Sequence, residues 1–221
     1  MYKICLVEDE KDLNDLVMTY LTRDNYEVVN FYNGKDAIHY VGHSVDLWIL
    51  DIMLGDDVSG YDILKKIRET DEMVPVIFTS ARDQDLDKII GLELGSDDYI
   101  TKPYSPKELV LRVNKLIKRV YSNKNNSLKY ENYIIDVSKR AVFYSEKEIA
   151  LTSLEFDLLV LFLENRNHSF EREEILNKVW GSNYFWSDRV VDDLVRRIRK
   201  KMPELKINTI YGFGYRLLWN I

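Results

Sequence analysis

The first half of the chain alternates short apolar runs with amphipathic stretches, and no hairpin turn joins one apolar run to the next. The runs that we expect as strands are Lys3–Val7, Val28–Phe31, Val45–Leu50, Val74–Phe78 and Tyr99–Ile100. The stretches with helical spacing are 13–21, 35–41, 61–68, 85–94 and 106–119. Strands that alternate with helices form parallel sheets covered on both faces. The pattern therefore predicts an α/β fold with a doubly wound parallel sheet.

The second half of the chain has a different order of elements. Two short β-like runs at Tyr133–Asp136 and Ala141–Tyr144 come first, and helices at 154–162, 171–179 and 190–201 follow. Two further runs flank Gly212-Phe213-Gly214 as a terminal hairpin. Residues 121–127 offer little to bury and are typical of a linker. Since 221 residues suit two domains of ordinary size, we expect a first domain over 1–120, a linker over 121–127 and an α+β domain over 128–221.

Charge is distributed unevenly between the two halves. Residues 1–121 hold 15 Lys and Arg against 23 Asp and Glu, a net charge of −8, whereas residues 122–221 hold 16 against 14, a net charge of +2. An acidic half joined to a mildly basic half indicates two tasks, of which the second is the better candidate for contact with nucleic acid. Random scatter of surface charge is the alternative that these counts leave open.

Cysteine content and hydropathy exclude several classes of protein. A single cysteine, Cys5, excludes an internal disulfide framework and a cysteine-rich zinc site. The first residues form no targeting segment, and no run approaches the roughly 18 apolar residues of a membrane span. These observations predict a soluble, cytoplasmic protein with no membrane partner.

Chemically matched side chains follow the expected strands where each strand ends. Glu8 and Asp9 follow the first strand, Asp51 the third and Ser80 the fourth, and Lys102 comes just after the fifth. Carboxylates on neighbouring strand ends lie within ~5 Å of one another, and at an effective dielectric of about 20 two such charges repel by roughly 3 kcal/mol. The cluster therefore needs a bound cation or protonated groups, and its oxygen ligands favour Mg²⁺. Unrelated surface acids are the alternative, which matched groups at successive strand ends disfavour.

Four short motifs contain these residues. They are VEDE at 7–10, LDIML at 50–54, PVIFTSA at 75–81 and DDYITKP at 97–103. In this order the motifs resemble the receiver domain of bacterial two-component response regulators, and the resemblance covers residues 1–120. It implies a CheY-like (βα)5 fold for this part of the chain.

The resemblance also implies roles for individual residues. Asp51 would be the phosphoacceptor for a phosphoryl group from a sensor histidine kinase. The other implied roles are Mg²⁺ binding by Glu8, Asp9, Asp51 and the backbone carbonyl of Met53, contact with phosphoryl oxygens by Ser80 and Lys102, a switch role for Tyr99, and a cis bond before Pro103. Phosphoryl transfer depends mainly on positioning and charge neutralisation, so the domain would act on itself and would not be a metabolic enzyme.

The loop after Asp51 departs from the family pattern. Where the family usually has Leu-Pro, this chain has Leu54-Gly55, and one extra residue precedes Gly60. Asp56 and Asp57 add negative charge beside the expected metal pocket. We expect slower or weaker phosphorylation than a loop with proline would give.

Charged residues of both signs are expected on the last helix and strand of this domain and on the helix before them. The OmpR/PhoB subfamily dimerises across the corresponding face, and the residues carried over by position are Lys88, Asp97, Asp98, Glu108, Arg112 and Arg119. The resemblance implies ion pairs across a two-fold axis that join Asp98 to Arg112, Asp97 to Arg119, and Lys88 to Glu108. An ordinary solvated surface is the alternative, because exposed pairs contribute only about 0–1 kcal/mol each.

Positive charge in the second half is concentrated on one helix. Residues 189–206 hold seven Lys and Arg against three Asp and Glu. Within the helix Arg196, Arg199 and Lys200 share a face, while Val191, Leu194, Val195 and Ile198 form an apolar stripe. A cationic helix followed by a hairpin suits insertion into a DNA groove. A solvated basic face is the alternative reading of the helix alone.

Four further motifs surround that helix. They are LTSLEFDLL at 151–159, REEILNKVWG at 172–181, RVVDDLVRRIRKK at 189–201 and YGFGYRL at 211–217. They resemble the winged helix-turn-helix effector domain of the OmpR/PhoB family, which implies a recognition helix over 187–201 and a wing over 207–219. The DNA-binding residues expected on this basis are Trp180, Arg189, Arg196, Arg197, Arg199, Lys200 and Tyr211. Leu194 stands where the family frequently has a histidine. Tyr211 replaces a frequent arginine of the wing, so we expect a weaker preference for A·T-rich flanks than is usual in the family.

These features predict a response regulator that is phosphorylated on Asp51, dimerises through its receiver domain and binds promoter DNA to regulate transcription. The expected partners are a sensor histidine kinase, double-stranded DNA, a second copy of the chain and RNA polymerase. Three alternatives remain: a dehalogenase-type phosphatase, which would need an acid where Met53 stands; a regulator that is dimeric without phosphate; and a flavodoxin-like module, which would need a Gly-rich loop after the first strand.

Overall fold

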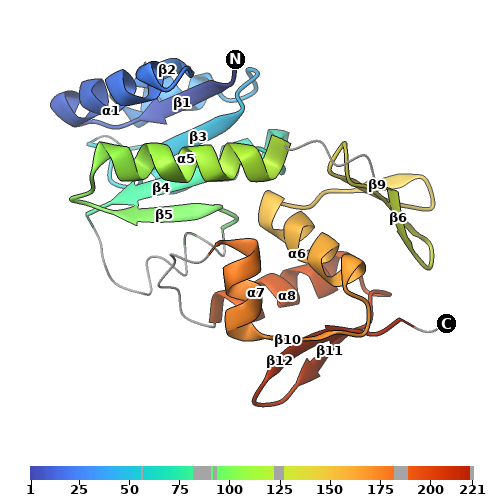
Figure 1. The fold of residues 1–221 in the computed structure, drawn as a ribbon. Helices are drawn as coiled ribbons and strands as arrows, with labels where there is room; N and C mark the ends of the chain where they lie inside the picture. Colours follow the sequence, from blue (N-terminus) through green and yellow to red (C-terminus); the bar gives the residue numbers. More distant parts are fainter. Residues whose placement is uncertain (56, 82–90, 92–93, 122–126, 182–188, 220–221) are drawn as a thin grey trace. The chain divides into compact units, whose positions relative to one another are not determined.

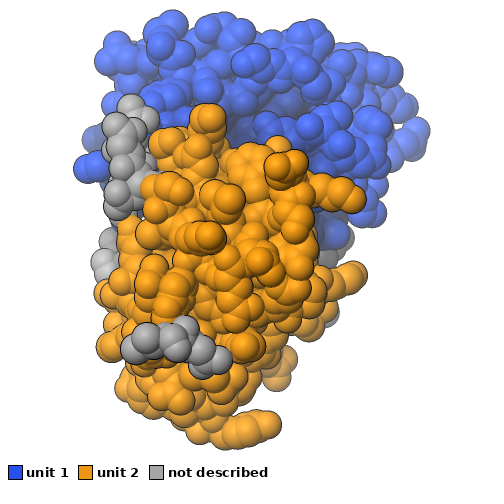
Figure 2. Space-filling model, turned by 90° about the vertical axis from the view of Figure 1, so that its right-hand side faces the viewer, with its two compact units in different colours: residues 1–122 blue, residues 123–221 orange. Residues whose placement is uncertain are grey.

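The structure is a computed structural model that describes residues 1–55, 57–81, 91, 94–121, 127–181 and 189–219. The chain divides into two compact units, unit 1 over Met1–Ser122 and unit 2 over Asn123–Ile221, which are coloured separately in Figure 2. The predicted α/β and α+β classes are both confirmed.

Unit 1 is built on a parallel five-stranded sheet in the order β2-β1-β3-β4-β5. The strands are β1 (Lys3–Val7), β2 (Glu27–Phe31), β3 (Leu47–Asp51), β4 (Val76–Ser80) and β5 (Asp98–Thr101). The helices are α1 (Lys11–Arg23), α2 (Gly34–His39), α3 (Gly60–Thr70) and α5 (Pro106–Tyr121). The helix predicted over 85–94 falls mostly outside the described residues. This strand order is that of an open doubly wound sheet, and Figure 1 shows the helices layered against it.

Helices cover both faces of the sheet, which is why its strands are apolar throughout. On one face Leu21 of α1 and Val113 of α5 share a buried cluster with Ile49 and Ile77 of the sheet. On the other face the ring of Tyr61, in α3, packs edge-on against Phe78 at 5.2 Å. Every residue of β3 and of β4 is buried, as expected for central strands of a parallel sheet.

Strand ends differ from the sequence prediction in one way that matters for the site. Thr79 and Ser80 were expected after the fourth strand, but β4 contains both of them, and Asp51 is the last residue of β3. Register pairs Asp51 with Thr79 and Ser80 with Thr101. The prediction ended the fourth strand at Phe78 because Thr79 and Ser80 are polar. Their backbones nevertheless pair with the neighbouring strands, so both residues belong to β4.

Unit 2 contains two antiparallel sheets and three described helices (Figure 1). The first sheet consists of β6 (Ser127–Tyr130), β7 (Tyr133–Asp136), β8 (Ala141–Tyr144) and β9 (Lys147–Ile149). The helices are α6 (Ser153–Glu164), α7 (Arg172–Val179) and α8 (Arg189–Lys201), and the second sheet has the order β10-β12-β11, formed by β10 (Ser169–Glu171), β11 (Ile207–Ile210) and β12 (Gly214–Leu217).

Three strands of unit 2 were not predicted. β6 and β9 are the outer strands of their sheet and present exposed polar residues such as Lys129 and Glu148, while β10 has only three residues. Such strands are held by pairing with a neighbour and carry little apolar signal of their own. α5 also extends to Tyr121, beyond its predicted end, where the Tyr121 hydroxyl donates a hydrogen bond to the carbonyl of Asp46 at 3.0 Å.

The apolar stripe predicted on α8 is confirmed as part of the core of unit 2. Val191, Leu194, Val195 and Ile198 are all fully buried. Their burial fixes which side of α8 faces the domain and which side remains for other contacts. Within the part of the chain that the structure describes, no helix is both long enough and apolar enough to cross a membrane.

Candidate functional site

The carboxyl ends of β1, β3, β4 and β5 meet at one edge of the sheet of unit 1. Glu8 and Asp9 follow β1, Asp51 ends β3, and these three residues offer carboxylate oxygens that all lie within 4.8 Å of one another. β1 pairs with β3 through Val7 and Leu50, so the topology brings the acids together. The cluster of Glu8, Asp9 and Asp51 is called the carboxylate site below.

Lys102, just after β5, contacts two of the three acids. Its ammonium group donates hydrogen bonds to Asp51 and, at 2.7 Å, to Glu8. Glu8 and Asp51 are almost completely buried, whereas Asp9 is exposed. The backbone of Lys102 is tied to β4, because its amide donates to the carbonyl of Ser80 at 2.7 Å, and the bond before Pro103 is cis, as expected.

Crowding of these charges changes their proton affinity. Burial raises the pKa of Glu8 to about 7, and the neighbouring Asp51 adds to the increase, while Lys102 opposes it. Burial lowers the pKa of Lys102, but its hydrogen bonds to Asp51 and Glu8 outweigh burial and raise the pKa overall. Lys102 is therefore a stable cation beside acids that are costly to ionise together.

Two backbone amides of the residues after Asp51 contact acids of the carboxylate site. The Met53 amide donates to Asp51 Oδ1 at 2.9 Å, and the Gly55 amide donates to Asp9 Oδ2 at 3.1 Å. At the end of the loop a Cβ added to Gly60 would lie 2.3 Å from the Asp51 carbonyl oxygen. Only glycine allows this close approach. Asp56 lies outside the described residues.

The donor set of the carboxylate site fits a hard divalent cation. It offers carboxylate oxygens, and among the described residues Lys102 is the single cation in contact with it. Three acids with one ammonium group leave an excess of negative charge, which an oxygen-binding cation such as Mg²⁺ would offset. Met53, whose carbonyl was expected among the ligands, lies in the loop beside Asp51 and has an exposed side chain.

Ser80 lies on β4, the strand next to Asp51, and Tyr99 lies on β5, one strand further along the sheet. Ser80 is fully buried at the end of β4. Tyr99, in β5, is 4% exposed, so its ring is turned into the unit, where a Cβ added to Gly91 would lie 3.5 Å from its Cδ2 atom. Tyr99 is therefore part of the packed interior of unit 1.

Two of the three ion pairs expected across a dimer axis are formed within this single chain. Arg119 pairs with Asp97 at 2.9 Å, and Arg112 pairs with Asp98 at 3.2 Å and with Glu108 at 2.7 Å. Asp97 and Asp98 are both almost fully buried. The long side chains of Arg112 and Arg119 thus reach from α5 to the acids at the start of β5 in the same chain. Lys88 lies outside the described residues.

Two of the cations expected to contact DNA are engaged inside unit 2. Arg199 donates to the carbonyl of Ile207 at 2.6 Å and to Thr209 Oγ1 at 2.9 Å, both on β11. Arg197 lies 3.4 Å from Glu155, which is 1% exposed, and Lys201 lies 2.9 Å from the same carboxylate. Arg199, which was expected on one face of α8 with Arg196 and Lys200, thus has its guanidinium bound by β11.

The outward side of α8 and the tip of the hairpin hold the other expected residues. Arg189, Arg196 and Lys200 are exposed, and Arg196 pairs with Asp193 of the same helix at 2.9 Å. Tyr211 is 94% exposed at the turn between β11 and β12. Trp180 is buried, and its indole nitrogen has no hydrogen-bond partner among the described residues.

One cluster in unit 2 escaped the sequence analysis. Asp192 of α8 accepts hydrogen bonds from Arg172 of α7 at 2.8 Å and from the Tyr215 hydroxyl of β12 at 2.7 Å. Burial and the bond to Asp192 raise the pKa of Tyr215 to about 12. The three residues are far apart in sequence and share no local pattern, so only the folded domain connects them.

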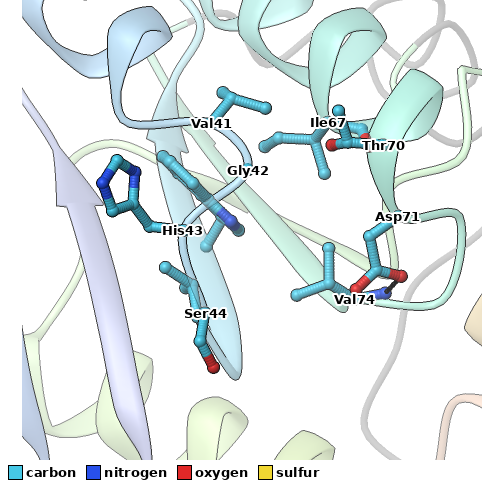
Figure 3. Close-up of a pocket in the computed structure, with 10 residues that line it drawn as sticks. Val41, Gly42, His43, Ser44, Ile67, Thr70, Asp71 and Val74 are labelled. Carbon is cyan, nitrogen blue, oxygen red and sulfur yellow. Dashed lines mark hydrogen bonds between the residues drawn. The ribbon is translucent and has the colours of Figure 1, made fainter.

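A separate hollow of about 330 Å³ lies at the amino ends of β3 and β4, the opposite end of those strands from Asp51 (Figure 3). It is lined by the loop after α2, including His43, and by the end of α3, including Asp71. The Asp71 carboxylate accepts the amides of Met73 and Val74 at 2.8 and 3.0 Å. The Asp71 carboxylate of the hollow is thus already hydrogen-bonded to two backbone amides. The carboxylate site is therefore the better candidate for a reactive site.

Each of the two units matches a known protein family. Residues 4–114 match the family described as response regulator receiver domain, and residues 146–217 match the family described as transcriptional regulatory protein, C terminal. The first match contains the whole carboxylate site, and the second contains α6, α7, α8 and the hairpin of β11 and β12.

Known proteins resemble the chain over its full length. The transcriptional regulatory protein CssR of Bacillus subtilis (strain 168) is 51% identical over 222 residues, with 98% of each chain covered. A solved structure of a RitR mutant is 26% identical with a TM-score of 0.78, and 100% of both chains is covered. Response regulator DrrB of Thermotoga maritima, an OmpR/PhoB homolog, is 32% identical with a TM-score of 0.54, covering 99% of this chain and 100% of that chain.

Proposed function

The chain belongs to the OmpR/PhoB-type response regulators, and from that premise we propose that phosphorylation of Asp51 by a sensor histidine kinase controls the binding of unit 2 to promoter DNA. The observation that carries the proposal is the contact of the Lys102 ammonium group with Asp51 and Glu8, beside the exposed Asp9. An acceptor carboxylate, a fixed cation and spare oxygen ligands are the parts that phosphoryl transfer requires.

In the proposed reaction an Asp51 oxygen attacks the phosphorus of a phosphohistidine on the kinase. The new O–P bond forms as the N–P bond breaks, and the imidazole leaves and takes up a proton. Lys102 would then share its charge between Asp51 and the phosphoryl oxygens, and the buried Ser80 hydroxyl would donate a hydrogen bond to one of them. Glu8, Asp9, Asp51 and the Met53 carbonyl would hold Mg²⁺, which supplies further neutralisation of the phosphoryl charge.

For unit 2 we propose that α8 enters the major groove and that the hairpin of β11 and β12 lies against the neighbouring backbone. The exposed cations Arg189, Arg196 and Lys200 would contact phosphates, and the buried Trp180 would support this surface from inside the unit. Tyr211 would contact the minor groove with its aromatic ring, where the family frequently has the charged side chain of an arginine. Arg197 and Arg199 would act indirectly, since both hold α8 in place.

Dimerisation through the β5 and α5 face is also part of the proposal. The pairs of Asp97 with Arg119 and of Asp98 with Arg112 would exchange an intrachain partner for the same partner on a second copy. Because such an exchange replaces like with like, its net free energy is small, which suits a switch that phosphorylation can tip. RNA polymerase would be a later partner of the DNA-bound dimer.

Phosphorylation of Asp51→Asn provides the direct test. Acetyl phosphate with Mg²⁺ is expected to raise the mass of the wild type by one phosphoryl group and to increase its affinity for its promoter, with no effect on Asp51→Asn. Glu69→Gln is the matched control, because Glu69 is an exposed acid of α3 that pairs with Lys66 of the same helix at 2.7 Å. Equal phosphorylation of Asp51→Asn and wild type would contradict the proposal.

A further inference from the structure

The loop after Asp51 is anchored on both sides of its unusual segment. At its start the Met53 amide donates to Asp51. At its end the Gly60 amide donates to the carbonyl of Ile52 at 3.2 Å, and Ser59 caps α3 by accepting the Asp62 amide. Gly55 therefore sits in a loop whose ends are fixed beside the carboxylate site.

Gly55 makes a contact that proline, the residue usual in the family at this position, cannot make. Its amide donates to Asp9 Oδ2 at 3.1 Å, and proline has no amide hydrogen. Asp9 is also the acid of the carboxylate site that Lys102 does not contact. Among the described residues, the Gly55 amide is thus the donor that orients the Asp9 carboxylate.

We propose that Gly55 is a positioning residue for the metal, which holds the exposed Asp9 side chain toward Glu8 and Asp51 through its backbone amide. The inference rests on the proposed function, because it takes the carboxylate site to bind Mg²⁺. Hydrogen bonds from outside the coordination shell fix the direction of ligands, and their loss weakens metal binding. An exposed aspartate without such a donor would have to be ordered by the cation itself.

Mg²⁺ titration of the unphosphorylated full chain by calorimetry tests the inference. Gly55→Pro removes the amide hydrogen, whereas Gly55→Ala keeps it and adds a Cβ whose nearest neighbour, at 3.1 Å, is the movable end of Asp9. We expect Gly55→Pro to weaken Mg²⁺ binding by about tenfold and Gly55→Ala by less than about threefold. Equal affinity in Gly55→Pro and wild type, or an equal loss in both variants, would overturn the inference.

A second background separates loss of the amide from general distortion of the loop. In an Asp9→Ala chain the Gly55 amide has no carboxylate to orient, so adding Gly55→Pro should leave the remaining Mg²⁺ affinity unchanged. A further tenfold loss in that background would show that proline acts by distorting the site, and would overturn the inference. Absence of Mg²⁺ binding by the wild type would instead contradict the metal site of the proposed function.

Discussion

Two groups of charged side chains in this protein differ in how far their charges are balanced internally. In the carboxylate site of unit 1, three acids lie together and Lys102, the one described cation in contact with the site, pairs with two of them, Glu8 and Asp51. In unit 2 the buried Glu155 engages two cations of α8, and β11 engages a third, Arg199. The first group leaves charge to be offset by a ligand, whereas much of the second is used to hold a helix.

The difference follows from the geometry of the two elements. Parallel strands end at one edge, so polar residues that follow them point into a shared space with few other partners. A helix projects its residues in all directions, so cations on adjacent turns reach different neighbours. Net charge of a segment therefore indicates a site more reliably at strand ends than along a helix.

The largest effect expected concerns Lys102. Lys102→Met removes the cation that contacts Asp51 and Glu8, so transfer from acetyl phosphate should slow by about a thousandfold, the scale of losing a cation that stabilises transferred phosphoryl charge. The rate of mass increase with time measures this loss. Lys107→Met, at an exposed lysine of α5, should transfer at the wild-type rate. A loss of less than tenfold in Lys102→Met would mean that Lys102 is not needed to neutralise the charge at the carboxylate site during transfer.

In unit 2 the corresponding change affects stability. Glu155→Ala leaves Arg197 and Lys201 without their shared buried carboxylate and removes the side chain that accepts the Thr152 amide at 2.9 Å. We expect the free energy of unfolding of unit 2 to fall by about 3 kcal/mol, measured by urea denaturation. Glu148→Ala, at an exposed position of β9, is the control. An unchanged transition would show that the α8 cations do not depend on Glu155.

Burial of Glu8 in the carboxylate site should also make the stability of unit 1 depend on pH. The pKa of Glu8 is about 7 in the folded chain and 4.5 as an ordinary value, so the folded state holds more protons than the unfolded state between these values. Stability without Mg²⁺ should therefore fall as pH rises from 4.5 to 7, by up to about 3 kcal/mol. Thermal unfolding at several pH values measures the slope. In Glu8→Gln the decline should be absent, and an equal decline there would assign it to other groups.

The grouping of residues in the carboxylate site could be predicted from the sequence more completely than the contacts of the cations on α8, and the reason is physical. Glu8, Asp51 and Lys102 sit at strand ends, and β-sheet geometry alone brings strand ends together. The fate of Arg199 depended on where β11 lies relative to α8, and the cluster of Asp192 with Arg172 and Tyr215 joins three separate elements. Such contacts follow from tertiary packing, which hydropathy patterns and charge counts do not specify. The short polar strands β6 and β9 were not predicted, because they form by pairing with a neighbouring strand and not through an apolar pattern of their own.

The smallest effects expected separate the two kinds of cation on α8. Arg196 is 67% exposed on its side chain, so Arg196→Ala should weaken promoter binding by about tenfold or less and reduce the slope of log affinity against log salt by about 1, while stability is unchanged. Arg199→Ala removes hydrogen bonds to Ile207 and Thr209, so it should lower stability by about 1 kcal/mol with the salt slope intact. Fluorescence anisotropy at several salt concentrations, with denaturation of each variant, measures both quantities. If Arg199→Ala changed the salt slope as much as Arg196→Ala, Arg199 would leave β11 for a phosphate in the complex, and unit 2 would then resemble unit 1 in holding its charge for a ligand.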